Sequence, residues 1–342
     1  MRPDPTPHLL IPFAACSAEA WLPTLQSLPP GSFQHLGQLL QGMQLVQTDT
    51  RDAESLSPPH ERALARAQGL ATLQTPDGLL PWAASEAMNQ LQAGPDKAWA
   101  WITPCHWAMG HLHATLSDPA LLDLREDESR TLLAMMQPYF QTDGITLHFQ
   151  TPGRWLAEGD LFHALPTASI DRVLARNVDA WLPDTKSAAP LRRLQNEMQM
   201  LLYTHPFNDE REARRQLPVN SFWISGTGAL PAAAGGEALT PALSQGEREQ
   251  VTLLHRKQVS MPRSLAQAVF KEDWGGYAQA WQALESVEIP AFLARQRAGE
   301  TVRLTLCGEH SAQTFETYRA SLWTKVSSLF SPLRPLDMLK QL

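Results

Sequence analysis

The sequence alternates short apolar runs with amphipathic segments, and this order restricts the fold more than any other feature. HLLIPFAA (8–15) is bounded by polar and proline residues, which predicts a buried strand. VNSFWIS (219–225) predicts a second strand, and the glycines at 226–228 predict a tight turn after it. APLRRLQNEMQMLLYTHP (189–206) predicts the clearest helix, because its apolar residues recur at helical spacing and a proline ends it. Strands that alternate with helices predict an α/β fold.

The remaining elements follow the same alternation. Further strands are expected at 144–150 and within 302–316, the second with a turn near Gly308. Helices are expected within 17–44, at 59–70, from about Asp127 to 140, and at 274–287.

Composition excludes several classes of protein. The chain of 342 residues is long enough for one large domain or two, and its net charge of −7 gives no general attraction to nucleic acid. No apolar run is long enough to span a membrane. The three cysteines are far apart and form no CxxC pair, so we expect a reducing, cytoplasmic compartment. PFAAC (12–16) only loosely resembles a lipoprotein cleavage site, because the apolar stretch before it is short and contains a proline.

A group of metal-type side chains lies in TPCHWAMGHLHATL (103–116). Cys105, His106, His111 and His113 fall within nine positions. Neither a helix nor an extended strand would direct all four toward one ion, and zinc sites usually draw ligands from more than one element. We therefore interpret the group as structural, with His106 as a hydrogen-bonded imidazole in apolar surroundings.

The segment 194–228 resembles the archaeal-type cofactor-independent phosphoglycerate mutases of the alkaline phosphatase superfamily. In those proteins an asparagine-bearing helix precedes His-Pro-x-Asn-x-x-Arg, Pro-x-Asn and a strand that ends in Gly-x-Gly. The matching residues are Asn196, His205, Pro206, Asn208, Arg211, Pro218, Asn220, Gly226 and Gly228. GLLPWAA, TPCHW, RWLAEGD and ASIDRVLARNVDAWLP also make most of the chain similar to a bacterial family of RpfE-type regulatory proteins.

The resemblance implies an α/β fold with an alkaline-phosphatase-like mixed sheet flanked by helices and a smaller inserted α/β region. It implies a discontinuous core of residues 1–85 and 219–342 and an inserted lid-like domain at 86–218. Residues 231–250 are small, polar and aperiodic and look like a translated genomic repeat, so we expect a mobile surface loop there.

The resemblance also implies a serine phosphorylated between two divalent metals, Mn²⁺ or Mg²⁺, which aspartates and histidines hold. Ser57 is the candidate nucleophile, with Ser55 equally placed, and the candidate metal ligands are Asp273, Glu309 and His310. The first strand lacks the expected aspartate at its end, and Tyr277 stands where a histidine is expected. No histidine follows His310, and Ser225 replaces an expected substrate arginine.

These departures predict a catalytically degenerate mutase relative with a regulatory or ligand-binding role and no cofactor, so activity as a phosphoglycerate mutase is not expected. The alternative is a working metal-dependent phosphomonoester mutase or hydrolase. A small phosphorylated or anionic molecule is the expected ligand, and we expect neither nucleic acid nor a membrane as partner. The candidate ligand-binding residues are Arg154, Arg172, Arg176, His205, Asn208, Arg211 and Asn220.

Overall fold

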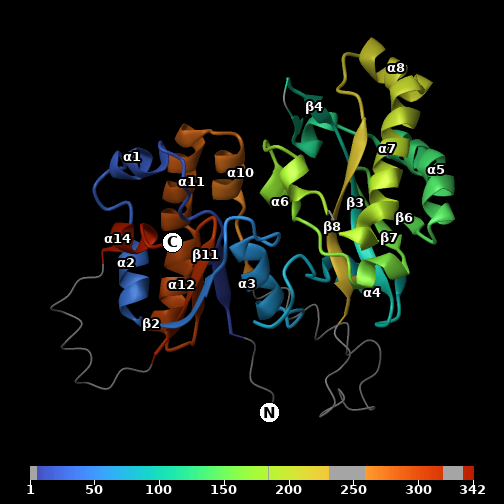
Figure 1. The fold of residues 1–342 in the computed structure, drawn as a ribbon. Helices are drawn as coiled ribbons and strands as arrows, with labels where there is room; N and C mark the ends of the chain where they lie inside the picture. The colour runs from blue at the N-terminus through green and yellow to red at the C-terminus, as the bar shows by residue number, and fades with distance from the viewer. Residues whose placement is uncertain (1–5, 112, 184, 231–258, 319–333) are drawn as a thin grey trace. The chain divides into compact units, whose positions relative to one another are not determined.

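The computed structural model divides the chain into two units (Figure 1). It describes every residue except 1–5, 112, 184, 231–258 and 319–333, so the predicted loop at 231–250 lies outside the described residues. The first unit consists of 1–54, 58–68 and 243–342, and the second consists of 55–57 and 69–242. The positions of the units relative to one another are not determined.

A mixed sheet forms the centre of the first unit. Its strand order is β2 (Met43–Thr50), β11 (Ser311–Thr317), β10 (Arg303–Cys307), β1 (His8–Ile11) and β9 (Val259–Ser260). β1 runs parallel to both β9 and β10, whereas β11 runs antiparallel to β10 and β2. β1 is shorter than the predicted strand because Pro12 follows it and cannot donate a ladder hydrogen bond.

Alternation along β1 divides the core of this unit between the two faces of the sheet. Leu9 and Ile11 pack with helices on one face, and Leu10 packs with Ala63 of α3 (Pro59–Ala67) on the other. The helices whose side chains join Leu9 and Ile11 are α1 (Trp21–Gln26), α2 (Gln34–Gln41), α10 (Ser264–Phe270), α11 (Trp274–Ser286), α12 (Glu288–Arg297) and α14 (Pro335–Leu339).

An antiparallel sheet forms the centre of the second unit. Its order is β6 (Thr146–Thr151), β7 (Arg154–Glu158), β3 (Ala98–Cys105) and β8 (Ser221–Ala229), and β4 (Trp107–Met109) and β5 (Ala114–Leu116) form a separate hairpin. α5 (Glu126–Thr142) and α7 (Ala189–Thr204) cover one face, and α4 (Trp82–Leu91) covers the other. The shorter helices are α6 (Ile170–Val173), α8 (Pro206–Ala213) and the 3-10 turns Pro119–Leu122, Asp160–His163, Asp179–Trp181 and Lys186–Ala188.

The predicted α/β class, with a mixed sheet flanked by helices, is confirmed. The boundaries of the inserted unit differ from the predicted 86–218, since this unit also contains 69–85 and β8. β8 belongs there because it pairs with β3 over almost its whole length, from Ser221 opposite Cys105 to Ala229 opposite Ala98. No helix among the described residues is long and apolar enough to cross a lipid bilayer.

The predicted tight turn at 226–228 is wrong, because β8 continues through both glycines. The register with β3 shifts at this point, and Gly226 has a φ of +65°. A Cβ atom on Gly226 would lie 2.8 Å from the ring of Trp101. Glycine is therefore required here for a bulge inside a strand, where the backbone lies close to an indole ring.

Candidate functional site

The carboxyl end of β1 is the first place where the mutase resemblance can be compared with the structure. The residues that follow β1 are apolar, and Phe13, Ala14 and Ala15 are all buried. The Ala14 amide donates to the Cys307 carbonyl oxygen at 2.7 Å, which fixes this loop beside the end of β10. Phe13 has a φ of +53°, and its ring contacts those of His60 and Phe270. No carboxylate lies among residues 12–16, so this strand end offers no anionic metal ligand.

Tyr277, on the first turn of α11, holds the same loop. Its hydroxyl lies 2.9 Å from the Phe13 carbonyl oxygen and 3.1 Å from that of Ala14, and it accepts a hydrogen bond from the Trp21 indole at 3.0 Å. Burial raises the pKa of the Tyr277 phenol, so it stays protonated at neutral pH. A neutral, fully buried hydroxyl is not a metal ligand, and its contacts are those of a structural residue.

The three predicted metal ligands all lie in the first unit, where Asp273 and Glu309 have structural partners. Asp273 is the N-cap of α11, and its carboxylate accepts from the Gly276 amide at 2.8 Å. Glu309 follows β10 and accepts from both the amide and the hydroxyl of Ser17, at 2.9 Å from the amide. His310 lies in the same turn, and its carbonyl oxygen accepts from the Arg51 amide at 3.0 Å.

Cys16 lies next to this turn and is half-buried. Burial, together with the nearby carboxylate of Glu309, raises the pKa of its thiol to about 11. The thiol is therefore protonated at neutral pH and is not an activated nucleophile.

Ser57 lies in the second unit, in a short turn that Asp77 organises. The Asp77 carboxylate accepts from the Leu56 amide at 2.6 Å, from the Ser57 amide at 3.0 Å and from the Ser55 hydroxyl at 3.1 Å. The Ser57 hydroxyl oxygen in turn accepts from the Gly78 amide at 3.0 Å. Ser57 is buried, with 4% of its surface exposed, and its hydroxyl oxygen helps to hold the turn.

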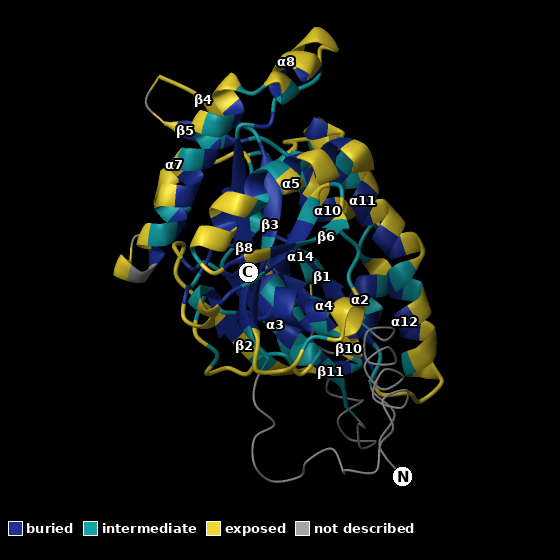
Figure 2. Ribbon diagram, turned by 90° about the vertical axis from the view of Figure 1, so that its right-hand side faces the viewer, coloured by how far each residue is buried: buried dark blue, intermediate teal, exposed yellow. Residues whose placement is uncertain are grey.

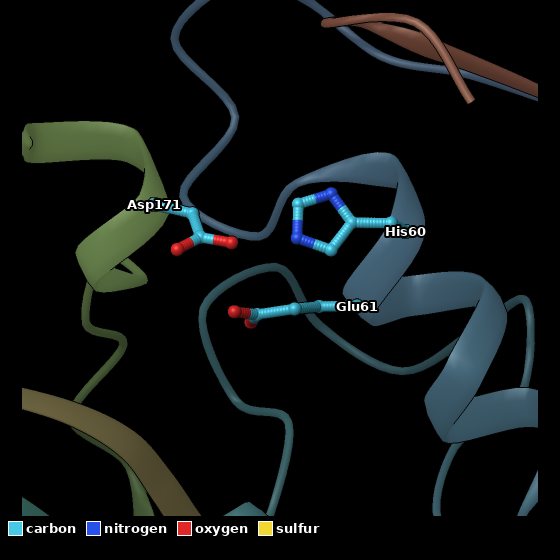
Figure 3. A group of neighbouring side chains, drawn as sticks. All are labelled: His60, Glu61 and Asp171. Atoms are coloured by element: carbon cyan, nitrogen blue, oxygen red, sulfur yellow. The ribbon is translucent and has the colours of Figure 1, made fainter. Parts of the chain in front are cut away.

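Three side chains outside the predicted set also carry nitrogen or oxygen atoms of the kind that bind metal ions. His60 and Glu61 lie on the first turn of α3, in the first unit, and Asp171 lies on α6, in the second (Figure 3). The sequence Pro-His-Glu at the start of a predicted helix could have drawn attention to His60 and Glu61 as metal-type residues. We assign no ion to these residues, because they come from units whose relative positions are not determined.

The residues matched to His-Pro-x-Asn-x-x-Arg have structural partners within the second unit. His205 caps α8, since its Nδ1 accepts from the Phe207 amide at 3.1 Å. Asn208 is buried and bonds the carbonyl oxygens of Leu202 and Val219 at 2.9 and 2.8 Å. Together these bonds join the end of α7, the start of α8 and the segment that enters β8.

Arg211 is fully buried and forms an ion pair with Glu128 of α5 at 3.1 Å. Its guanidinium also donates to the carbonyl oxygens of Leu217 and Leu122. Asn220 accepts from the Trp107 amide at 2.7 Å and donates to the Trp107 carbonyl oxygen at 3.0 Å. Both side chains therefore connect separate segments of this unit.

The three other predicted ligand-binding arginines lie on β7 and around α6. Arg154 stacks on the Trp101 ring at 4.3 Å and pairs with Glu86 at 3.3 Å. Arg172 is buried on α6, and Arg176 is exposed just beyond it. Because binding requires atoms that a solute can reach, the accessible members of the predicted set are the exposed Arg176 and the half-buried Arg154, His205 and Asn220.

The Cys105–His113 segment is divided between β3 and the β4–β5 hairpin. Cys105 is fully buried, and burial raises the pKa of its thiol. The Nδ1 of His106 lies 2.9 Å from the Pro218 carbonyl oxygen. His111 and His113 are exposed, and the Gly110 amide donates to the His113 carbonyl oxygen at 3.0 Å to close the hairpin. These contacts agree with a structural role for Cys105 and His106.

Comparisons with solved structures give distant similarities, among them the two that follow. No protein-family model matches the chain, and no curated protein matches it, so membership of the RpfE-type family stays a prediction. The PH0037 protein from Pyrococcus horikoshii is similar with a TM-score of 0.45 and 11% identity, over 91% of this chain and 87% of that one. A cofactor-independent phosphoglycerate mutase from Thermoplasma acidophilum is similar with a TM-score of 0.36 and 13% identity, over 98% and 99% of the two chains.

Proposed function

We propose that this protein is a catalytically inactive relative of the phosphoglycerate mutases, with a regulatory or ligand-binding role. The proposal starts from the sequence resemblance in 194–228 and from the ligands that the resemblance expects and the chain lacks. It assigns no metal to the protein, and it takes a small phosphorylated or anionic molecule as the ligand.

The observation that carries the proposal is the environment of the Tyr277 hydroxyl. Tyr277 stands where the resemblance expects a metal-binding histidine, and its hydroxyl faces the carbonyl oxygens of Phe13 and Ala14, where the resemblance expects an aspartate. A pair of divalent cations needs anionic and imidazole donors to neutralise and fix it. A neutral phenol and two buried alanines supply neither.

Two of the remaining candidate ligands support the same conclusion. Asp273 already caps a helix, and Glu309 already accepts two hydrogen bonds from Ser17. Recruiting either carboxylate to an ion would leave backbone amides without their acceptor, at a cost of about 1 kcal/mol for a helix cap. Both carboxylates therefore already have a structural role in the first unit.

The alternative function is a metal-dependent phosphomonoester mutase or hydrolase with Ser57 as the nucleophile. Ser57 directly precedes Pro58, the N-cap of α3. The start of a helix favours a negatively charged group, such as the phosphate of a phosphoserine, and this position supports the alternative. The same experiment separates the two functions.

That experiment measures metal content and phosphatase activity on the full-length protein. Elemental analysis of protein purified without chelator is expected to find manganese, magnesium and zinc far below one ion per chain. Hydrolysis of p-nitrophenyl phosphate with added Mn²⁺ is expected to be the same for the wild type, Ser57→Ala and the matched control Ser55→Ala. Stoichiometric metal together with turnover that Ser57→Ala abolishes and Ser55→Ala retains would establish the alternative.

Ligand binding is tested separately on the accessible cations. We expect a phosphomonoester such as 3-phosphoglycerate, titrated calorimetrically, to bind the wild type and to bind Arg176→Gln more weakly. Arg295→Gln, an exposed arginine of the first unit that pairs with Glu300, is the control. Equal heats for all three proteins, or no heat for any, would argue against an anionic ligand at this position.

A further inference from the structure

Asp49, near the end of β2, is shared by three arginines of the first unit. Its carboxylate lies 2.6 Å from Nη1 of Arg66, 3.0 Å from Nε of Arg62 and 3.8 Å from Nε of Arg51. Burial acts to raise the pKa of Asp49, but the guanidinium groups of Arg62 and Arg66 outweigh it and lower this pKa. Asp49 is therefore ionised at neutral pH, and the four side chains, three positive and one negative, carry a formal charge of +2.

The fold places the three arginines at different depths. Arg62 and Arg66 are one turn apart on α3, and Figure 2 shows this helix mostly in the dark blue and teal of buried and half-buried residues. The side chain of Arg62 is 7% exposed and that of Arg66 is 15% exposed, whereas that of Arg51, just after β2, is 46% exposed. Arg62 therefore contacts Asp49 from the interior, and a solute reaches the guanidinium groups of Arg51 and Arg66.

Arg66 has hydrogen-bonding capacity for a further acceptor. A guanidinium group has five N–H bonds in a planar fork, which suits the oxygens of a phosphate. With the Gln47 amide turned so that its oxygen faces Arg66, this oxygen accepts from Nε at 3.1 Å and from Nη2 at 3.3 Å. Asp49 pairs with Nη1. These two partners use three of the five N–H bonds, which leaves two for an anion.

The cluster lies at the edge of the sheet where α/β proteins commonly bind ligands. β2, β10 and β1 run in the same direction, because β10 is parallel to β1 and β11 is antiparallel to both β2 and β10. Their carboxyl ends therefore lie at the same edge, and Asp49 and Arg51 flank the last residue of β2 there. In open α/β sheets ligands bind outside the carboxyl ends of the strands.

We propose that Arg51 and Arg66 bind a phosphate group, either free phosphate or the phosphate of a small molecule, at the carboxyl end of β2. Asp49 and Arg62 hold the two guanidinium groups in position. A dianionic phosphate balances the formal charge of these four side chains, whereas a carboxylate, with one negative charge, does not. This site goes beyond the proposed function, because it lies in the first unit and Arg176, where an anion was considered above, lies in the second.

Calorimetric titration of the full-length protein with inorganic phosphate at neutral pH tests the site. Arg51→Gln should raise the dissociation constant of phosphate about ten-fold, because one charged hydrogen-bonding group is lost. Arg51→Lys should raise it by less, since the charge remains, and Arg66→Gln should also weaken binding. The control is Arg295→Gln, which removes an exposed arginine paired with Glu300 and should leave the dissociation constant unchanged. Circular dichroism checks that each variant folds.

Two further titrations define the ligand. Acetate should bind much more weakly than phosphate, because it carries one negative charge, and equal binding of the two anions would contradict the proposal. Methyl phosphate separates the two sources of the group. Tighter binding than inorganic phosphate indicates a phosphomonoester as the ligand, and weaker binding indicates the free ion.

The proposal is overturned by the absence of phosphate binding to the wild type, or by a dissociation constant that Arg51→Gln and Arg66→Gln leave unchanged. It is also overturned if Arg176→Gln alone abolishes binding, and the anionic ligand of the proposed function then remains. Conversely, metal-dependent turnover that requires Ser57 would overturn the proposed function without affecting phosphate binding at Arg51 and Arg66.

Discussion

The hydroxyl of Tyr277 lies 2.9 Å from the carbonyl oxygen of Phe13, and this contact joins a helix to the loop that leaves the first strand. Phe13 holds a left-handed backbone conformation, which is uncommon for a bulky residue. The phenol therefore helps to maintain a conformation that the loop would not adopt alone.

Tyr277→Phe should lower the free energy of unfolding by about 1–3 kcal/mol, because it leaves the Trp21 indole and two carbonyl oxygens without their buried partner. Urea denaturation followed by circular dichroism measures the change. Tyr203→Phe is the matched control, since Tyr203 is 84% exposed and should change stability by less than about 0.5 kcal/mol. Equal stability of the two variants would contradict the structural role of the Tyr277 hydroxyl.

Arg211→Ala should destabilise the protein by about 1–3 kcal/mol, because it removes a buried guanidinium that bonds Glu128 and two carbonyl oxygens, although Arg214 still pairs with Glu128. Lysine should not substitute well, since one ammonium group cannot reach Glu128 and the carbonyl oxygens of Leu217 and Leu122 together. Thermal unfolding measures both variants. Arg295→Ala removes an exposed ion pair with Glu300 and serves as the control. A small effect at Arg211, similar to that at Arg295, would show that the buried pair does not stabilise the fold.

Stability should fall between pH 6.5 and pH 4 because of His8. Burial, together with the positive charge of Arg303, lowers the pKa of its imidazole from 6.5 to about 4. In this pH range the unfolded state binds a proton that the folded state does not, so stability rises with pH and is lost as pH falls. The contribution is about 3 kcal/mol in total, because each pKa unit corresponds to about 1.4 kcal/mol.

The control for this pH effect is His8→Gln. The His8 imidazole lies 2.7 Å from the Thr305 hydroxyl, and a glutamine amide can form the same hydrogen bond but does not titrate. Urea unfolding of both proteins across the pH range isolates His8, since other groups cancel in the difference. Parallel stability curves for the two proteins would rule out His8 as the source of the slope.

Gly226→Ala should destabilise the protein by more than Gly69→Ala. Both glycines have a positive φ, so alanine strains the backbone at either position, at about 1 kcal/mol. A Cβ atom at Gly226 would also meet Trp101, whereas at Gly69 it would meet nothing within 4 Å. The difference between the two variants in denaturant therefore measures the close approach to Trp101, and equal losses would show that this approach has no energetic consequence.

The sequence predicted the elements whose signals are local. The strands around Leu9 and Leu304 and the helix at 189–204 appear where apolar periodicity placed them. The bulge at Gly226 was missed because it depends on an indole ring from another strand. The extent of the inserted unit was missed because the pairing of β8 with β3 joins segments more than a hundred residues apart.

The candidate site shows the same division between local and non-local information. The sequence itself shows that no carboxylate follows the first strand and that position 277 is a tyrosine, but it does not show what these residues contact. It could not show that Arg211 pairs with Glu128, which lies 83 residues earlier in the chain. A basic residue in a motif is compatible with either a ligand or an internal partner, and only the folded arrangement distinguishes them.

The pairing of Leu9 with Leu304 has a consequence for biosynthesis. On the ribosome, the amino-terminal strand emerges long before the partner that completes its hydrogen bonds, while all of the strands of the second unit emerge in between. We infer that the second unit can fold during translation, whereas the sheet of the first unit cannot close until β10 has been synthesised. Until then the apolar segment HLLIPFAA lacks its β10 partner, and an unpaired apolar strand of this kind is prone to aggregate unless a chaperone covers it.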